Sequence, residues 1–97
     1  MPRTRSARIW HSLMKYYVYI VECSDASLYT GYSLDVEKRV WQHNFGKRGA
    51  KSLKGKLPVR LVHYEEYKTK SQALKRELEI KSWPRDRKLK LITDLKA

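Results

Sequence analysis

The chain has 97 residues, of which 22 are Lys or Arg and 10 are Asp or Glu, and its formal net charge is +12 at neutral pH. This length leaves room for one hydrophobic core, and no apolar run approaches the roughly 18 residues of a membrane-spanning helix. The positive charge favours a polyanionic partner, nucleic acid first, while a single cysteine and no signal peptide favour the cytoplasm.

The first part of the chain predicts a basic extension followed by a β-hairpin. Residues 1–13 contain three arginines and no acid, so we expect a flexible extension ahead of a single domain that spans residues 14–97. Residues 16–23 are aromatic and β-branched, which predicts a strand, and residues 28–32 predict a second one. The sequence SDAS between them is typical of a turn.

A helix and a basic loop are predicted next. Ser33 or Asp35 can cap the start of this helix, and Gly46 stands where a helix ends. Residues 46–57 contain three glycines and five basic residues without an acid, which predicts a flexible, basic loop.

The last part of the chain predicts one strand and two helices. Residues 58–67 are typical of a strand that starts at a proline. Thr69 and Gln72 form a capping-box pattern before a helix near residues 70–82, and Pro84 opens a final helix. The order ββαβαα predicts an α+β fold, with a central three-stranded antiparallel sheet flanked by helices.

Glu77 is unusual for its position on the predicted helix near residues 70–82. At 100° per residue, the apolar side chains share a face of roughly 160°, and Glu77 projects into its middle with Lys81 beside it. The apolar side chains of this face are Ala73, Leu74, Leu78 and Ile80. A buried carboxylate costs several kcal/mol, by order of magnitude, unless it is paired or bound to a cation. Two interpretations stay open, an ion pair with Lys81 and a metal ligand or acid at the floor of a cleft.

Arg39 and His43 are four residues apart and lie along one edge of the stripe that Val36 and Val40 form. From such an edge, a side chain can reach across the face of a sheet while its stem packs. Taken alone, such a pair is more often a solvated arginine and a histidine at the boundary of the core.

Tyr19 and Tyr29 face the same side of the hairpin only if the connection has an odd number of residues. A three-residue connection, Ser24-Asp25-Ala26, would set Tyr19 opposite Gly31, whose missing side chain would leave room for a backbone phosphate. A connection of two or four residues would separate the two phenols. We expect aromatic core packing for the other five tyrosines, Tyr16, Tyr17, Tyr32, Tyr64 and Tyr67.

The candidates follow one another along the chain as VYI at 18–20, YTG at 29–31, Arg39, His43 and Glu77. In this order and over residues 15–95, the chain resembles the GIY-YIG nuclease superfamily, and more closely its small stand-alone bacterial branch. VYI replaces the first glycine of the family pattern, and YTG replaces its middle isoleucine. The downstream asparagine that is common in the superfamily has no counterpart, because Asn44 is the only asparagine of this chain.

The resemblance implies hydrolysis of a phosphodiester with one divalent metal ion. Glu77 would hold Mg²⁺ or Mn²⁺, and Arg39 would bind the scissile phosphate. Tyr19 would take the proton of the attacking water and pass it to His43, while Tyr29 would orient the water or the phosphate. An unperturbed phenol has a pKa of about 10, so we expect a cationic site that lowers the pKa of Tyr19.

The expected function is a DNA endonuclease of repair or recombination that prefers a DNA structure or acts without sequence choice. Its contacts with the nucleic acid would be Gly31, Lys47, Arg48, Lys51, Lys54, Lys56 and Lys81. The alternative is a nucleic-acid-binding module of the same fold with little or no activity, which the missing asparagine supports and which would bind RNA equally well. A ribosome-associated or structural basic protein leaves Glu77 and the paired tyrosines unexplained.

Overall fold

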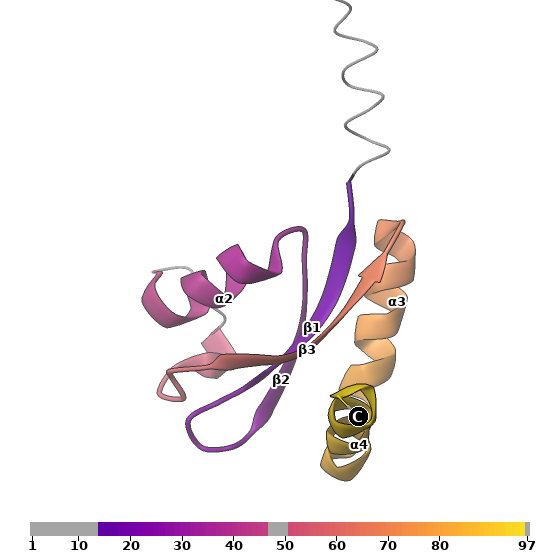
Figure 1. Cartoon of the computed structure of the whole chain (residues 1–97). Helices are drawn as coiled ribbons and strands as arrows, with labels where there is room; N and C mark the ends of the chain where they lie inside the picture. The colour runs from indigo at the N-terminus through magenta and orange to yellow at the C-terminus, as the bar shows by residue number, and fades with distance from the viewer. Residues whose placement is uncertain (1–13, 47–50, 97) are drawn as a thin grey trace, which may run out of the picture.

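Three antiparallel strands form the centre of the structure, which is a computed structural model and describes residues 14–46 and 51–96. The elements follow the predicted order ββαβαα and confirm the α+β fold (Figure 1). They are β1 (Tyr16–Glu22), β2 (Leu28–Ser33), α2 (Val36–Phe45), the short 3₁₀ helix η1 (Lys51–Leu53), β3 (Arg60–Tyr67), α3 (Lys70–Lys81) and α4 (Arg85–Lys96). Within the described ranges, no helix is long and apolar enough to cross a membrane.

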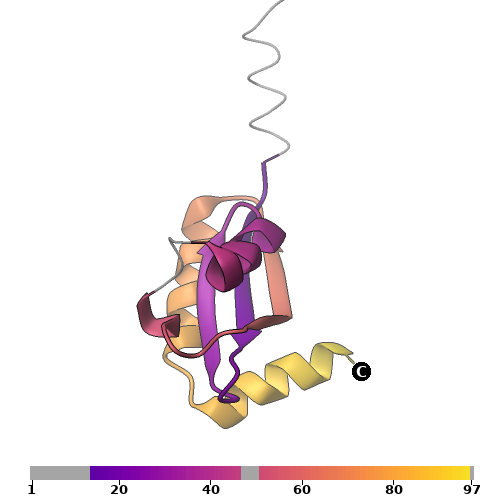
Figure 2. The ribbon, with the colours of Figure 1, turned by 90° about the vertical axis from the view of Figure 1, so that its left-hand side faces the viewer.

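The central strand is β1, which pairs with β2 on one side and with β3 on the other, so the order in the sheet is β2-β1-β3. Helix α2 and η1 lie on one face of the sheet, and α3 lies on the other face (Figure 1). Figure 2 shows α4 turning away from the end of α3 and extending past the sheet. Each face of β1 is therefore covered by a different helix.

The turn between β1 and β2 sets the register of the hairpin. The Cys23 N–H donates to the Ser27 carbonyl at 2.8 Å, which leaves three turn residues, Ser24-Asp25-Ala26. Tyr19 consequently pairs with Gly31, and Tyr29 lies two residues before Gly31, on the same face. Of the connections that the sequence left open, the structure contains the three-residue one, which brings both phenols to one face.

Local capping signals place the helix ends correctly. The Asp35 carboxylate accepts from the Lys38 N–H at 3.1 Å at the start of α2, and the Gly46 N–H donates to the Gln42 carbonyl at its end. Thr69 caps α3 by accepting from the Gln72 N–H at 3.2 Å. Helix α4 begins directly after Pro84.

The third strand begins two residues later than the sequence predicts. Pro58 has no N–H, and the N–H and carbonyl of Val59 bond the Asn44 side chain at 2.7 and 2.9 Å instead of a strand. Pairing with β1 therefore starts at Arg60, opposite Glu22. The described part of the expected loop also departs from the prediction, because η1 anchors it by burying Leu53 in the core.

Two hydrophobic clusters fill the two faces of the sheet, because alternate residues of β1 point to opposite sides. The cluster under α2 contains Tyr19, Val21, Cys23, Val36, Leu53 and Val59. The cluster under α3 and α4 contains Val18, Ile20, Ala73, Ile80 and Ile92.

Two expectations about the core are wrong. Leu78 is 67% exposed, because the buried face of α3 runs through Ala73 and Ile80 and leaves Leu78 on the far side. Tyr64 is also exposed, whereas the other four tyrosines expected in the core are partly buried against it.

Candidate active site

Tyr19 lies in the middle of the sheet, and its hydroxyl forms a buried hydrogen bond with His43. Its side chain projects from β1 toward α2, and the hydroxyl oxygen lies 2.8 Å from Nε2 of His43. His43 faces inward because it shares the helical spacing of Val36 and Val40, which pack on the sheet. Two groups that can exchange a proton are thus held together away from bulk solvent.

Gly31 is required by the position of the Tyr19 ring. A Cβ at Gly31 would lie 2.5 Å from Cζ of Tyr19, and closer still to its hydroxyl. The room that the sequence analysis reserved for a phosphate is therefore filled by the phenol itself. A glycine at this point of β2 lets the Tyr19 ring lie flat across the neighbouring strand.

Tyr29 and Arg39 complete the surroundings of this pair. The Tyr29 ring centroid lies 6.4 Å from that of Tyr19 and 5.5 Å from that of His43, the latter edge-on. Arg39, one helical turn before His43, hydrogen-bonds the Tyr19 hydroxyl and donates from Nη1 to Oε1 of Gln42 at 3.2 Å. The edge position predicted for Arg39 and His43 on α2 therefore brings both side chains to Tyr19.

The proton equilibria of the pair are dominated by burial. Burial, and after it the neighbouring Tyr29, raise the pKa of Tyr19 to about 12, and Arg39 offsets only part of this rise. Burial, and after it the charge of Arg39, lower the pKa of His43 below 6.5. Arg39 therefore does not by itself produce the lowered pKa that was expected for Tyr19 in a cationic site with its metal ion. In the protein alone, a protonated phenol faces a neutral imidazole at pH 7.

Glu77 lies on the inward side of α3, and its side chain is 14% exposed. Its Oε2 lies 3.5 Å from Nζ of Lys81, whose side chain is 48% exposed, so the predicted ion pair is present. The negative charge of Glu77 also raises the pKa of Tyr19, by less than burial or Tyr29 does, although Tyr19 points toward α2 and Glu77 lies on α3, on the other face of the sheet (Figure 1). Both interpretations of Glu77 remain compatible with this arrangement.

The donor groups fit a hydrated magnesium ion better than a metal enclosed by protein ligands. No group of three or more His, Cys, Asp or Glu side chains that could hold a metal occurs in the described parts of the chain. Mg²⁺ binds through one or two carboxylates and keeps most of its waters, so a single carboxylate such as that of Glu77 would be enough to hold it. A separate feature on the face of β2 toward α3 is Thr30, whose buried hydroxyl has no hydrogen-bond partner among the described residues.

Residues 15–90 match the family of the GIY-YIG catalytic domain. The chain belongs to the GIY-YIG family. This is a family of nucleases, so nucleic acid is the class of substrate, and its members generally use a divalent metal ion. Tyr19, Arg39 and Glu77 all lie within the GIY-YIG match.

Small relatives match most of this chain along most of their own length. The chain is 58% identical over 80 residues to a UPF0213 protein of Staphylococcus saprophyticus, a match that covers 82% of this chain and 96% of the relative. It is 60% identical over 76 residues to a UPF0213 protein of Haloquadratum walsbyi, covering 78% and 84%. The solution NMR structure of the UPF0213 protein BH0048 from Bacillus halodurans is similar, with 41% identity, a TM-score of 0.54, and coverage of 82% and 84%.

The basic residues expected to contact nucleic acid differ in their surroundings. Lys51 and Lys54 are exposed on and after η1 of the GIY-YIG domain. Lys56 lies 3.9 Å from the Asp25 carboxylate, and Lys81 lies beside Glu77. The remaining two, Lys47 and Arg48, fall outside the described residues.

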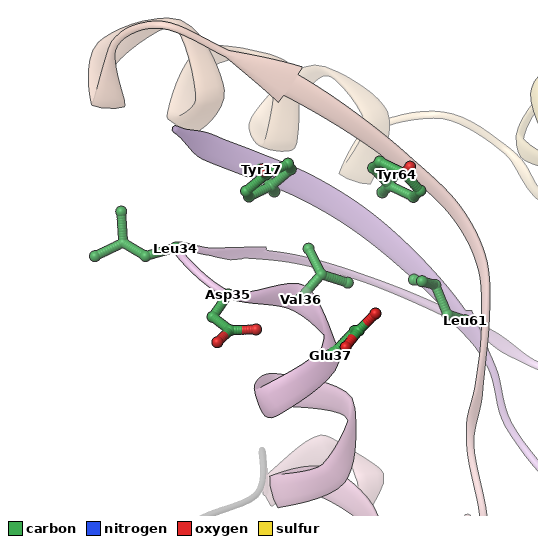
Figure 3. Close-up of a pocket in the computed structure, with 7 residues that line it drawn as sticks. All are labelled: Tyr17, Leu34, Asp35, Val36, Glu37, Leu61 and Tyr64. Atoms are coloured by element: carbon green, nitrogen blue, oxygen red, sulfur yellow. The ribbon is translucent and has the colours of Figure 1, made fainter. Parts of the chain in front are cut away.

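A hollow of about 380 Å³, which none of Tyr19, Tyr29, Arg39 and His43 lines, lies between the start of α2 and β3 (Figure 3). Figure 3 shows Glu37 extending toward Leu61 across this hollow. Its walls are Tyr17, Leu34, Asp35, Val36, Glu37, Leu61 and Tyr64. Two carboxylates would repel a phosphate, so the hollow is not where a GIY-YIG enzyme would hold the scissile group.

A polar network that the sequence analysis missed holds α3 against the sheet. Glu65 accepts hydrogen bonds from His63 Nε2 at 2.9 Å, from the Tyr67 hydroxyl at 2.6 Å and from Arg76 Nε at 2.8 Å. Burial acts to raise the pKa of Glu65, but these hydrogen bonds outweigh it and hold that pKa far below its usual value. The only signal in the sequence is the alternation His63, Glu65, Tyr67, which puts three polar groups on one face of a strand.

Proposed function

We propose that the protein is a metal-dependent endonuclease that hydrolyses DNA phosphodiester bonds, prefers a DNA structure or acts without sequence choice, and works in repair or recombination. The observation that carries the proposal is the buried hydrogen bond between Tyr19 and the neutral His43, next to Arg39 and under the influence of Glu77. Belonging to a nuclease family supports the reaction class.

Tyr19 and His43 act as a proton relay in this proposal. With a pKa near 12, Tyr19 is a poor base by itself, because almost none of it is ionised at pH 7. As the phenol takes a proton from the attacking water, it donates its own proton to Nε2 of His43. The imidazole is therefore the final acceptor, and a free phenolate does not have to accumulate.

Arg39 binds the scissile phosphate, since its planar guanidinium can bond two phosphate oxygens and stabilise the charge that develops on them. A phosphate at Arg39 also favours the protonated form of His43, because its negative charge offsets the new positive charge in a buried place. Tyr29 orients the water or the phosphate through its hydroxyl.

Glu77 would hold the Mg²⁺ or Mn²⁺ ion, which when bound supplies charge stabilisation for the leaving oxygen. Lys81 pairs with the carboxylate while the ion is absent, and its half-exposed side chain can turn to a phosphate of the DNA. Lys51, Lys54 and Lys56 contact the backbone of the substrate and read no sequence.

The test is nicking of supercoiled plasmid and of branched DNA, with and without Mg²⁺ or Mn²⁺. We expect nicking to need the metal and to fall at least about 100-fold in Tyr19→Phe, Arg39→Ala and Glu77→Gln. Glu79→Gln is the matched control, because Glu79 lies on the same helix with an exposed side chain. Nicking that persists in Glu77→Gln would assign the activity to another protein in the preparation.

A second candidate is a nucleic-acid-binding module with the same fold and no activity. Asn44 favours it, since this only asparagine of the chain gives both ends of its amide to the Val59 backbone and is not available to a substrate. DNA binding without nicking on any of the substrates, at any metal concentration, would support the module over the enzyme.

A further inference from the structure

Two large aromatic side chains lie side by side on the outer face of α2. Trp41 is 59% exposed and Phe45 is 73% exposed, and their ring centroids are 5.8 Å apart. They are four residues apart and therefore neighbours on the helix surface, on the side opposite to the inward-facing Val36 and His43. We call them the aromatic pair.

The aromatic pair contributes little to the fold. In the described ranges, the only ring contact of Trp41 is with Phe45, whereas Trp83 is stacked by the guanidinium groups of Arg76 and Arg87 at 5.0 and 4.1 Å. Two adjacent exposed rings form a patch of apolar surface, and such patches mark interaction sites more often than isolated apolar residues do. Since neither ring is buried, the stability of the fold gives no reason for aromatic rather than polar residues at positions 41 and 45.

The charge around the aromatic pair selects a polyanion. Lys38 is exposed and lies three residues before Trp41, on the same side of α2. The chain after Phe45 leads to Lys51 and Lys54, which are exposed at η1, on the same face of the sheet as α2 (Figure 1). A ligand for this surface has negative charges along its length and flat apolar groups between them.

We propose that the aromatic pair stacks unpaired bases of a single-stranded or branched nucleic acid. In a duplex the base faces are covered by their neighbours, so exposed rings can stack only on bases that have left the helix. This inference rests on the proposed function and adds a class of substrate to it. Helix α2 carries the aromatic pair on its outer side and His43 on its inner side, so the same helix would contact both the unpaired strand and the reaction site.

The test is equilibrium binding in EDTA, so that cleavage plays no part, with a labelled single strand, the matching duplex and a duplex with a single-stranded flap. We expect Trp41→Leu and Phe45→Leu each to weaken single-strand and flap binding by about 10-fold, the effect of losing one stacked base. Duplex affinity should stay within about twofold. Trp41→Phe keeps a ring and should retain most of the affinity, and Leu89→Ala, an exposed apolar residue of α4, is the matched control.

Unfolding in urea, measured for each variant, is the control that checks whether the fold is intact. Equal loss on single strand and duplex, or no loss on either, would overturn the proposal. So would unchanged strand binding accompanied by the loss of a dimer in analytical ultracentrifugation, which would make the aromatic pair a contact between two copies. The two proposals can fail separately. If the wild-type protein does not nick DNA with either metal while Trp41→Leu still loses single-strand binding, the nuclease proposal fails and the stacking proposal stands.

Discussion

The proposed relay from Tyr19 to His43 gives cleavage an expected dependence on pH. Only the neutral imidazole can accept the proton of the phenol, and its pKa lies below the ordinary 6.5 because of burial and the charge of Arg39. We predict that kcat/KM for nicking falls on the acidic side at a pH below 6.5, not at the pH of an exposed histidine. Initial rates between about pH 5 and 8 check this, and an acidic limb centred above neutrality would contradict the relay.

The same lowered pKa acts on stability, with a sign that follows from proton linkage. Between the lowered pKa of folded His43 and 6.5, the unfolded chain binds more protons than the native one. The free energy of unfolding therefore falls as the pH drops through this window. In His43→Gln this part of the decline should disappear, which urea unfolding on either side of the window measures.

Gly31 is the residue whose substitution should disturb the site most directly. Its missing side chain makes the room for the Tyr19 ring, so Gly31→Ala has to displace that ring or the strand. We predict a loss of about 1–3 kcal/mol in the free energy of unfolding and a loss of nicking. In a Tyr19→Leu background, urea unfolding should show a clearly smaller cost of Gly31→Ala. Equal costs in both backgrounds would mean that the phenol is not what the new methyl group meets.

At the scale of the elements, the sequence predicts what short-range chemistry decides. The three-residue turn after Cys23 and the alternation of side chains place Tyr19 opposite Gly31, and single capping residues such as Asp35 place the helix ends. The rotation of α3 is different, because it depends on Arg76 reaching Glu65 on a strand eleven residues away. Leu78 is turned to solvent by this rotation, and no local pattern predicts it.

The candidate site shows the same division. The sequence pattern was enough to gather Arg39 and His43 on one edge of α2, and the structure brings both to Tyr19. The direction in which the pKa of Tyr19 shifts could not be predicted, because it depends on how completely α2 covers the phenol once the chain has folded. The role of Asn44 could not be predicted either. Its two hydrogen bonds to the Val59 backbone join segments that are distant in the sequence, and the periodicity of a helix or a strand predicts only contacts between near neighbours.

The Glu65–Arg76 contact between β3 and α3 should be one of the more costly polar contacts to break. Glu65→Gln leaves the partly buried Arg76 guanidinium without its buried charge partner and with only the exposed Glu79, for which we predict a loss of about 3 kcal/mol in the free energy of unfolding. Glu79→Gln removes the other carboxylate that Arg76 contacts, but Glu79 is exposed, and the loss should stay below about 1 kcal/mol. Urea unfolding compares the two.

Amide exchange locates the effect of this contact. If the contact fixes α3, the amides of α3 should exchange faster in Glu65→Gln than in the wild type, while those of α2 on the other face stay protected. A cost for Glu65→Gln no greater than that for Glu79→Gln would show that the hydrophobic face of α3, through Ala73 and Ile80, is sufficient to position the helix.

At the scale of the whole molecule, the net charge of +12 is unevenly distributed, so that the surface has both acidic and basic regions. The hollow at the start of α2 is bordered by Asp35 and Glu37, whereas Lys51 and Lys54 stand exposed at η1. A polyanion should therefore meet the protein at the lysines and avoid the hollow. Phosphate contacts and base stacking can be separated by salt, because only the former release counterions.

We predict that duplex binding weakens steeply with salt, and that replacing both Lys51 and Lys54 by Gln reduces the slope of log K against log[salt] by about 2, or about 0.9 for each lost phosphate contact. Lys75→Gln, an exposed lysine on the outer side of α3, is the matched control and should leave the slope unchanged. Trp41→Leu should lower single-strand affinity without changing its slope, because stacking carries no charge. A flat salt response of the wild type would argue against a polyanionic partner, and an unchanged slope in the double lysine variant would place the phosphates elsewhere on the molecule.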